Sequence, residues 1–229
     1  MLNSHVDRRQ FLQAVFSSAI LGSAAHAGLD LALAPTLHAQ TTLTPDEALR
    51  ELLAGNQRFA TNHLNSITHN LTIMKERTVN KQEPFAAVLA CADSRIPVEL
   101  VFDQTIGHIF VTRVAGNVVT PEIVASLEFG VAVLGIKTIL VMGHTNCGAV
   151  RAAMTTDTVP GQISVLYQRI YPAIEKSGGN IDKAIHANAK IQAELLRASS
   201  TVIRETTKSG TLRVESAVYD LATGKVGLV

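Results

Sequence analysis

Apolar residues beyond residue 40 form short continuous runs and stripes at helical spacing. The continuous runs are typical of strands buried on both faces, and they cover residues 85–90, 108–114 and 138–142. Helices are expected over residues 121–134, 146–154 and 180–208. Strands that alternate with helices in this order predict an α/β fold, with a mostly parallel β-sheet core covered by helices.

A helical arm is predicted before the first strand. Thr44 can cap this helix, Pro45 suits its first turn, and Glu47 completes a capping box with Thr44. The apolar stripe of the arm consists of Leu49, Leu52, Leu53 and Phe59. Gly55-Asn56 weakens the last turns, so the position where the helix ends stays open.

The end of the chain carries a hairpin signal. Residues 212–229 hold two strand-like segments joined by the turn Ala222-Thr223-Gly224. No internal repeat, low-complexity segment or linker interrupts residues 40–229. We therefore expect residues 40–229 to form a single domain.

The first 39 residues resemble an export signal. Arg8 and Arg9 lead into an apolar segment, and small residues follow near Ala27 and Ala39. The order Arg-Arg-x-Phe-Leu resembles a bacterial twin-arginine signal, which predicts a periplasmic or equivalent extracytoplasmic location. Cleavage after Ala39, which removes residues 1–39, is preferred to cleavage after Ala27, because a polar stretch follows Ala39. A membrane anchor is the alternative, but the interrupted apolar run falls short of the roughly 20 residues that a spanning helix needs, and we expect no membrane span after cleavage.

Composition narrows the class of function. Twenty basic against nineteen acidic residues leave a formal net charge of +1, which argues against a broad nucleic-acid surface. Two cysteines exclude a disulfide-dense scaffold and any site with four thiolates. Aromatic residues make up 4% of the chain with no Trp, so stacking platforms for bases or sugars are not expected. A hydrophobic content of 47% supplies a sizeable core, which favours a compact enzyme domain.

Both cysteines follow predicted parallel strands. Cys91 comes after the first run, and His144 and Cys147 come after the third. Because the carboxyl ends of such strands border one ligand crevice, these three side chains can converge. A Cys-His-Cys set suits Zn²⁺, which accepts a water or a carboxylate as its fourth ligand. Cys147 also lies at the N-terminus of a predicted helix, which should lower its pKa, and Asp93 and Arg95 follow Cys91 closely.

Each of these features also has an ordinary explanation. The two cysteines could form a disulfide or be small buried side chains. His144 could be a hydrogen-bonded core histidine, and Asp93 with Arg95 could be a surface ion pair of little weight. The combination of Cys-x-Asp-x-Arg after one strand with His-x-x-Cys after another is what favours a metal site.

Three sequence blocks carry a family resemblance. Residues 91–97 (CADSRIP) and 143–149 (GHTNCGA) resemble the two signatures of the β-class carbonic anhydrases, and residues 113–117 (RVAGN) are similar to a third block. The resemblance covers residues 44–229. It implies a lyase, a carbonic anhydrase that reversibly hydrates carbon dioxide to bicarbonate and a proton, with hydroxide generated at one Zn²⁺ per subunit.

The resemblance also implies roles for individual residues. The zinc ligands would be Cys91, His144 and Cys147. Asp93 matches an aspartate that binds zinc in a closed form or pairs with Arg95 in an active form, and Gln82 matches a glutamine that hydrogen-bonds the substrate. The resemblance implies a homodimer or a higher homo-oligomer, with each site near a subunit interface and the helix from Thr44 wrapping the partner.

One departure from the family concerns regulation. The bicarbonate-regulated subtype carries a Trp where this chain has Val88, whereas Arg113 matches another residue of that regulatory pocket. We therefore expect the open arrangement, in which Asp93 pairs with Arg95. No proton shuttle is assigned, and the candidates by residue type alone are His63, His69 and His108.

Three rival functions stay open at this point. A hydrolase for CS₂ or COS could use the same scaffold, because these molecules are linear like carbon dioxide. A non-catalytic zinc-binding module is disfavoured, since a structural site has no need of Asp93, Arg95 and Gln82. A redox protein could use Cys91 and Cys147 as a switch.

Overall fold

The computed structural model describes residues 41–66, 71–155 and 159–229. The predicted export signal and both of its cleavage sites lie outside these residues. Within the described ranges, no helix is both long and apolar enough to cross a membrane.

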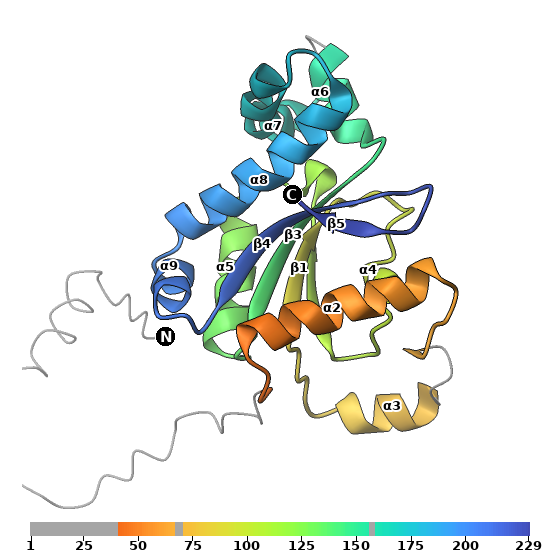
Figure 1. The fold of residues 1–229 in the computed structure, drawn as a ribbon. Coiled ribbons are helices and arrows are strands. Elements are labelled where there is room, and N and C mark those ends of the chain that lie inside the picture. The colour runs from red at the N-terminus through yellow and green to blue at the C-terminus, as the bar shows by residue number, and fades with distance from the viewer. Residues whose placement is uncertain (1–40, 67–70, 156–158) are drawn as a thin grey trace, which may run out of the picture. The chain divides into compact units, whose positions relative to one another are not determined.

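A five-stranded sheet forms the centre of the fold (Figure 1). Its strands are β1 (Ala86–Ala90), β2 (Ile109–Arg113), β3 (Thr138–His144), β4 (Arg213–Tyr219) and β5 (Val226–Leu228). They lie in the order β2-β1-β3-β4-β5, and only the β4–β5 pair is antiparallel. The predicted mostly parallel sheet and the carboxyl-terminal hairpin are therefore confirmed.

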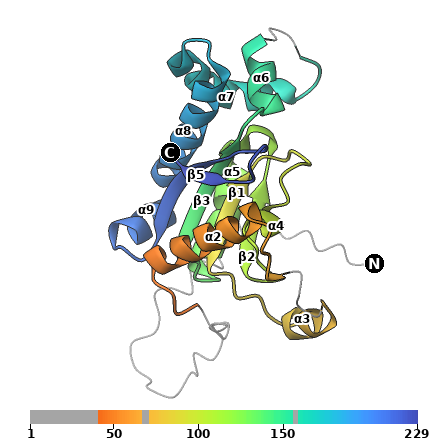
Figure 2. The same ribbon diagram turned by 45° about the vertical axis from the view of Figure 1, so that its right-hand side comes forward.

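Both faces of the sheet are covered by helices. Ala86, Val88 and Ala90 point into one apolar cluster, which includes residues of the helix α2 (Pro45–Ala60). Ala87 and Leu89 alternate to the other face, where they pack with α5 (Pro121–Ala132) and α9 (Thr201–Lys208). The two views of the ribbon show α2 crossing the strands on one side of the sheet (Figure 1, Figure 2).

The other predicted helices are present with shifted ends. Residues 146–154 correspond to α6 (Gly148–Thr155). The long helical region 180–208 is divided into α8 (Ile181–Ser199) and α9, because Ser200 takes an extended conformation and its hydroxyl accepts from the N–H of Ile203. The structure also contains helices that the sequence analysis did not predict: α3 (Leu71–Thr78), α4 (Val98–Val101) and α7 (Ile163–Ser177).

The arm helix α2 begins as predicted. The Thr44 hydroxyl accepts from the N–H of Glu47, and the Glu47 carboxylate accepts from the N–H of Thr44, which is a complete capping box. Leu49 and Leu52 are buried, whereas Leu53 and Phe59 are half-buried.

Gly55 and Asn56 do not end this helix, because both are buried against distant parts of the chain. A Cβ at position 55 would lie 1.9 Å from the carbonyl oxygen of Phe102, so only glycine fits there. The Asn56 amide donates to the carbonyl of Gly224 (2.9 Å) and accepts from the N–H of Val226 (2.8 Å). This helix therefore packs on its own chain, and its expected contact with a partner subunit stays a prediction.

A buried carboxylate also ties α2 to the core. The side chain of Asp103 is fully buried, and it pairs with the Arg58 guanidinium of α2. The same carboxylate accepts from the N–H groups of Asn65 (3.0 Å) and Ser66 (2.8 Å). Burial raises the pKa of Asp103, but the bonds from Arg58, Ser66 and Asn65 outweigh it and lower the pKa to about 2.

Candidate metal centre

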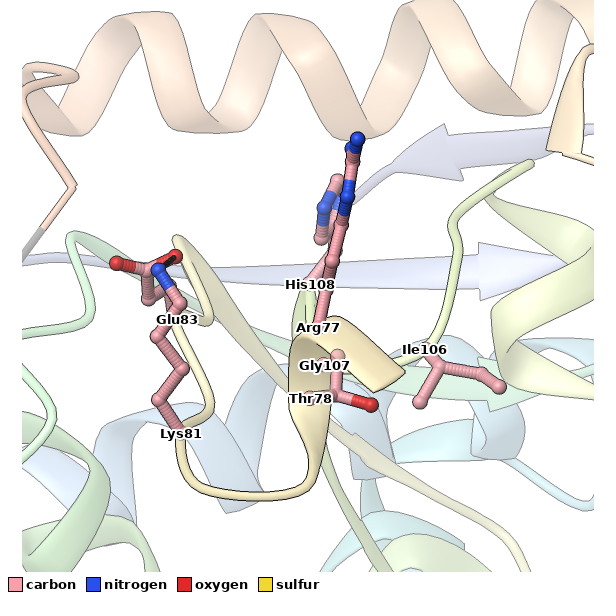
Figure 3. A pocket seen from close by; sticks show the side chains of 7 residues that line it. All are labelled: Arg77, Thr78, Lys81, Glu83, Ile106, Gly107 and His108. Atoms are coloured by element: carbon pink, nitrogen blue, oxygen red, sulfur yellow. Dashed lines mark ion pairs between the residues drawn. The ribbon is translucent and has the colours of Figure 1, made fainter. Parts of the chain in front are cut away.

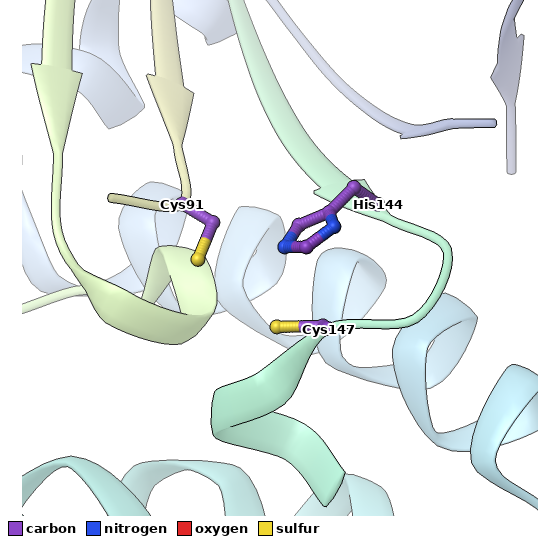
Figure 4. Close-up of side chains that lie close together, drawn as sticks. All are labelled: Cys91, His144 and Cys147. Atoms are coloured by element: carbon purple, nitrogen blue, oxygen red, sulfur yellow. The ribbon is translucent and has the colours of Figure 1, made fainter. Parts of the chain in front are cut away.

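Two adjacent parallel strands bring the three predicted ligands together. Cys91 follows the end of β1, and His144 is the last residue of β3, which pairs with β1. Cys147 follows three residues later, directly before α6. The candidate ligand atoms of all three side chains lie within 4.8 Å of one another. All three residues are buried, and Figure 4 shows their side chains directed into one common space.

The orientation of His144 leaves one ring nitrogen free. Its Nδ1 lies 2.9 Å from the carbonyl oxygen of Thr145. A carbonyl can only accept, so Nδ1 carries the proton and Nε2 presents a lone pair. Nε2 is buried and has no hydrogen-bond partner among the described residues. A buried nitrogen in this state is unfavourable unless a ligand takes up its lone pair.

The two cysteines are free thiols, and each changes the acidity of the other. Contact with Cys147, supported by His144 and by the N–H of Gly116, lowers the pKa of Cys91 to about 4. The same contact with Cys91 raises the pKa of Cys147. Two thiolates this close repel each other, whereas a divalent cation between them favours both anions.

The prediction that the helix terminus gives Cys147 a lowered pKa was therefore wrong, because the pKa of Cys147 is raised overall. The backbone N–H groups of Ala149 and Val150, at the start of α6, do act to lower it. Cys91 has the larger effect in the opposite direction, because its sulfur is close and its surroundings are buried.

Asp93 is held away from the cluster by Arg95. The guanidinium donates from Nε to Asp93 Oδ1 (2.9 Å) and from Nη2 to Oδ2 (2.7 Å), and the backbone N–H of Arg95 also reaches Oδ1 (3.0 Å). These bonds hold the pKa of Asp93 far below its usual range. Asp93 Oδ2 nevertheless lies only 3.8 Å from His144 Nε2, at the border of the cluster.

Arg113 contacts the backbone beside Asp93. It donates from Nε to the carbonyl of Cys91 (2.9 Å) and from Nη2 to the carbonyl of Asp93 (2.5 Å). The resemblance matched Arg113 to a regulatory pocket. In this chain its guanidinium holds the turn between a candidate ligand and the candidate catalytic carboxylate.

Gln82 does not join the cluster within one chain. It lies before β1, whereas Cys91 follows the other end of that strand. The four residue steps of β1 alone separate these ends by about 13 Å. The Gln82 side chain is exposed. Any contact of Gln82 with this centre would have to come from another copy of the chain.

His108 also lies at the far end of the sheet. It precedes β2, and it borders a cavity of about 460 Å³ formed by parts of residues 77–83 and 106–108 (Figure 3). In that cavity Lys81 pairs with Glu83 at 3.0 Å. His63 is exposed, with Nδ1 3.2 Å from the Thr61 hydroxyl, and His69 lies outside the described residues. Neither His63 nor His108 is placed beside the Cys-His-Cys cluster, and the structure does not test His69.

Comparison with known proteins identifies the family. The sequence profile of carbonic anhydrases matches residues 86–226. This chain belongs to the carbonic anhydrase family. A carbonic anhydrase of Mycolicibacterium smegmatis is 34% identical over 194 residues, which is 80% of this chain and 93% of the relative. Carbonic anhydrase 2 of Mycobacterium tuberculosis is 31% identical over 196 residues, with 80% and 92% covered.

Solved structures place this carbonic anhydrase in the β class. A Coccomyxa β-carbonic anhydrase in complex with acetazolamide superposes with a TM-score of 0.64 at 27% identity, over 79% of this chain and 86% of that one. The β-carbonic anhydrase CcaA shares the fold at 22% identity, with a TM-score of 0.63. The protein is accordingly an enzyme that hydrates carbon dioxide to bicarbonate and a proton.

Proposed function

We propose that this carbonic anhydrase works with one Zn²⁺ held by the sulfurs of Cys91 and Cys147 and by Nε2 of His144. The buried, unpartnered Nε2 within 4.8 Å of both sulfurs is the observation that carries the proposal. Two thiolates and a neutral imidazole balance the charge of Zn²⁺ and leave a fourth position for water. When bound in such a set, zinc supplies hydroxide near neutral pH.

The carboxylate of Asp93 would orient the nucleophile. As an acceptor beside the cluster, it would accept the hydrogen bond of the hydroxide and so direct an oxygen lone pair toward the carbon of carbon dioxide. Addition of hydroxide to this carbon would give bicarbonate, as one C=O electron pair moves onto oxygen. The proton that water loses is released to solvent. Arg95 keeps Asp93 ionised through two charge-assisted bonds, so the carboxylate stays an acceptor.

Metal analysis combined with stopped-flow carbon dioxide hydration tests this proposal. We expect about one zinc per chain and turnover that is lost with a chelator and restored by Zn²⁺. Turnover that survives complete removal of zinc would refute the metal role. Sulfide release from CS₂ and COS, measured on the same preparation, compares the rival substrates directly.

We further propose that the working enzyme is a homodimer or a higher homo-oligomer. One solved structure with this fold, from Sordaria macrospora, is of a tetrameric β-carbonic anhydrase. The edge strand β2 carries half-buried apolar residues, and Phe129 of α5, next to Phe110, is 47% exposed. An apolar edge strand of this kind is a surface that a second copy can cover. Mass measurement in solution separates monomer from oligomer.

Gln82 of a second copy could also act on the substrate at the metal centre of the first. Its amide would donate to the oxygen on which negative charge grows. Mixed oligomers test this: Gln82→Ala subunits keep the metal site, and Cys147→Ser subunits keep the glutamine. If Gln82 acts across the interface, mixing two weakly active variants restores turnover, because one site regains both parts. No recovery in oligomers shown to be mixed would rule out a role for Gln82 across subunits.

The export signal forms the last part of the proposal. The paired arginines and the small residues near Ala39 support export with removal of residues 1–39 and a periplasmic or equivalent location. Amino-terminal sequencing of protein isolated from the producing bacterium tests both the removal and its position. Replacing both Arg8 and Arg9 by Lys should keep the protein inside the cytoplasm.

A further inference from the structure

Helix α8 carries two buried amides that the proposed reaction does not use. Asn188 and Gln192 are 1% and 0% exposed, and they lie one helical turn apart on the same face. Their buried neighbours on this helix are small or apolar: Ala184, Ile185, Ala189, Ala193 and Leu196. Buried amides are unfavourable unless they are hydrogen-bonded, so the partners of these two side chains show what they do.

Both amides bind the loop that follows β2. Asn188 Nδ2 donates to the carbonyl of Gly116 (2.8 Å), and Gln192 Oε1 accepts from the N–H of Val119 (2.8 Å). Gln192 Nε2 donates to Asn188 Oδ1 (3.2 Å) and to the carbonyl of Arg169 (3.0 Å), which fixes both amides in one orientation. The loop of residues 116–119 is therefore held at two points from one helix face.

The same loop contacts a sulfur of the metal centre. The N–H of Gly116 donates to Sγ of Cys91 at 3.2 Å. Gly116 takes a φ of +74° inside a short 3₁₀ turn (Ala115–Asn117), a conformation that favours glycine. The amide of Asn188 binds the carbonyl of this glycine, and the glycine's own N–H faces the thiolate. Two hydrogen bonds therefore connect Asn188 of α8, through Gly116, to the proposed zinc ligand Cys91.

We propose that Asn188 and Gln192 are positioning residues for the Cys91 sulfur: they fix the loop so that the N–H of Gly116 points at Sγ. The inference rests on the proposed role of Cys91 as a zinc ligand. A hydrogen bond from an N–H to a thiolate restrains the direction of the sulfur and reduces the electron density that it gives to a metal. The amides of α8 would therefore set both the affinity of the centre and the electron donation from its sulfur.

A purely structural role makes a different prediction. If the amides only stabilise the core, their removal lowers the melting temperature and leaves the metal centre of the folded protein unchanged. If they position Cys91, the folded variant binds metal more weakly and its sulfur–metal bond changes. A control variant must therefore lose stability without removing a hydrogen bond to the loop.

The experiment compares Asn188→Leu with Leu196→Ala on the full chain. Leu196 is on the same helix and fully buried, it belongs to the apolar cluster that contains no candidate ligand, and its side chain makes no hydrogen bond, so it serves as the matched control. Zinc affinity is measured by competition with a chromophoric chelator, and Co²⁺ substitution reports the sulfur-to-metal charge-transfer band. For Asn188→Leu we expect affinity about 10- to 100-fold lower, as is typical when a group that orients a ligand is lost. The band should also shift to longer wavelength, whereas Leu196→Ala should change only the melting temperature.

Two isosteric variants cover the case in which Asn188→Leu does not fold. Asn188→Asp keeps the shape of the side chain and removes the donor to the Gly116 carbonyl. Gln192→Glu removes the donor to Asn188 Oδ1 and to the Arg169 carbonyl, and it keeps an acceptor for the N–H of Val119. Wild-type affinity and an unshifted band in a folded Asn188 variant would overturn the inference, while the proposed zinc site would stand. If the Cys91→Ser variant binds zinc as tightly as the wild type, the proposed function is overturned instead.

Discussion

The buried carboxylate of Asp103 gives a prediction about stability that depends on pH. Asp103 pairs with Arg58 of α2 and accepts hydrogen bonds from the backbone N–H groups of Asn65 and Ser66. Asp103→Asn keeps the shape of the side chain and removes its charge. The variant therefore tests how much the ionised carboxylate contributes to holding α2 on the core.

The size of the effect follows from the pKa. The pKa of Asp103 is lowered from 3.8 to about 2. At about 1.4 kcal/mol per pKa unit, the ionised form stabilises the folded state by about 2 kcal/mol. Because the pKa is lower in the folded than in the unfolded state, this contribution is fully present above about pH 4. It is lost as the pH falls from about 4 to about 2.

Chemical denaturation of wild type and Asp103→Asn at about pH 7 and about pH 2 measures the difference. A chelator is present throughout, so that metal binding does not contribute. We expect a loss of about 2 kcal/mol near neutral pH and little difference in acid. Asp46→Asn is the control, since Asp46 pairs with Arg213 at 2.7 Å but is 64% exposed and should contribute at most about 1 kcal/mol. An equal loss at both pH values would show that the charge of Asp103 is not the cause.

Three further predictions concern the metal centre and the packing of α2. Asp93→Asn should retain zinc and lose about 100-fold or more in turnover; unchanged turnover removes Asp93 from the mechanism. Cys147→Ser should be isolated with little zinc by elemental analysis, and a fully loaded variant contradicts its assignment as a ligand. Gly55→Ala places a Cβ 1.9 Å from the Phe102 carbonyl and should lose about 3 kcal/mol in denaturation. Gly148→Ala, with nothing within 4 Å, is its control; equal effects of the two would refute the packing argument.

The sequence predicted the elements whose local signals agree with their tertiary surroundings. Residues 85–90 and 138–142 are continuous apolar runs, and they form central strands because the sheet is covered on both faces. The capping box at Thr44 predicted where α2 begins, since a cap is a local interaction. The convergence of Cys91, His144 and Cys147 was predictable as well, because parallel strands end at one edge of the sheet.

Other features could not be predicted, because they depend on contacts between distant residues. Helix α7 holds Pro172 and has no capping side chain, so local rules disfavour it. Gly55 and Asn56 weaken a helix in isolation, but the carbonyls they meet belong to distant parts of the chain. The opposite pKa changes of the two cysteines require knowing that the sulfurs lie close together, which spacing along the chain does not give.

The alternation of β1 between two apolar clusters has a practical consequence. Cys91 and Cys147 belong to the cluster on the α2 side, and the cluster with α5 and α9 contains no candidate ligand. Protein engineers could therefore search for heat-tolerant forms at positions such as Leu127, Val131 and Ile203, on the face away from the chemistry. Libraries of variants confined to these positions should change the thermal stability of the protein and leave its catalytic rate almost unchanged.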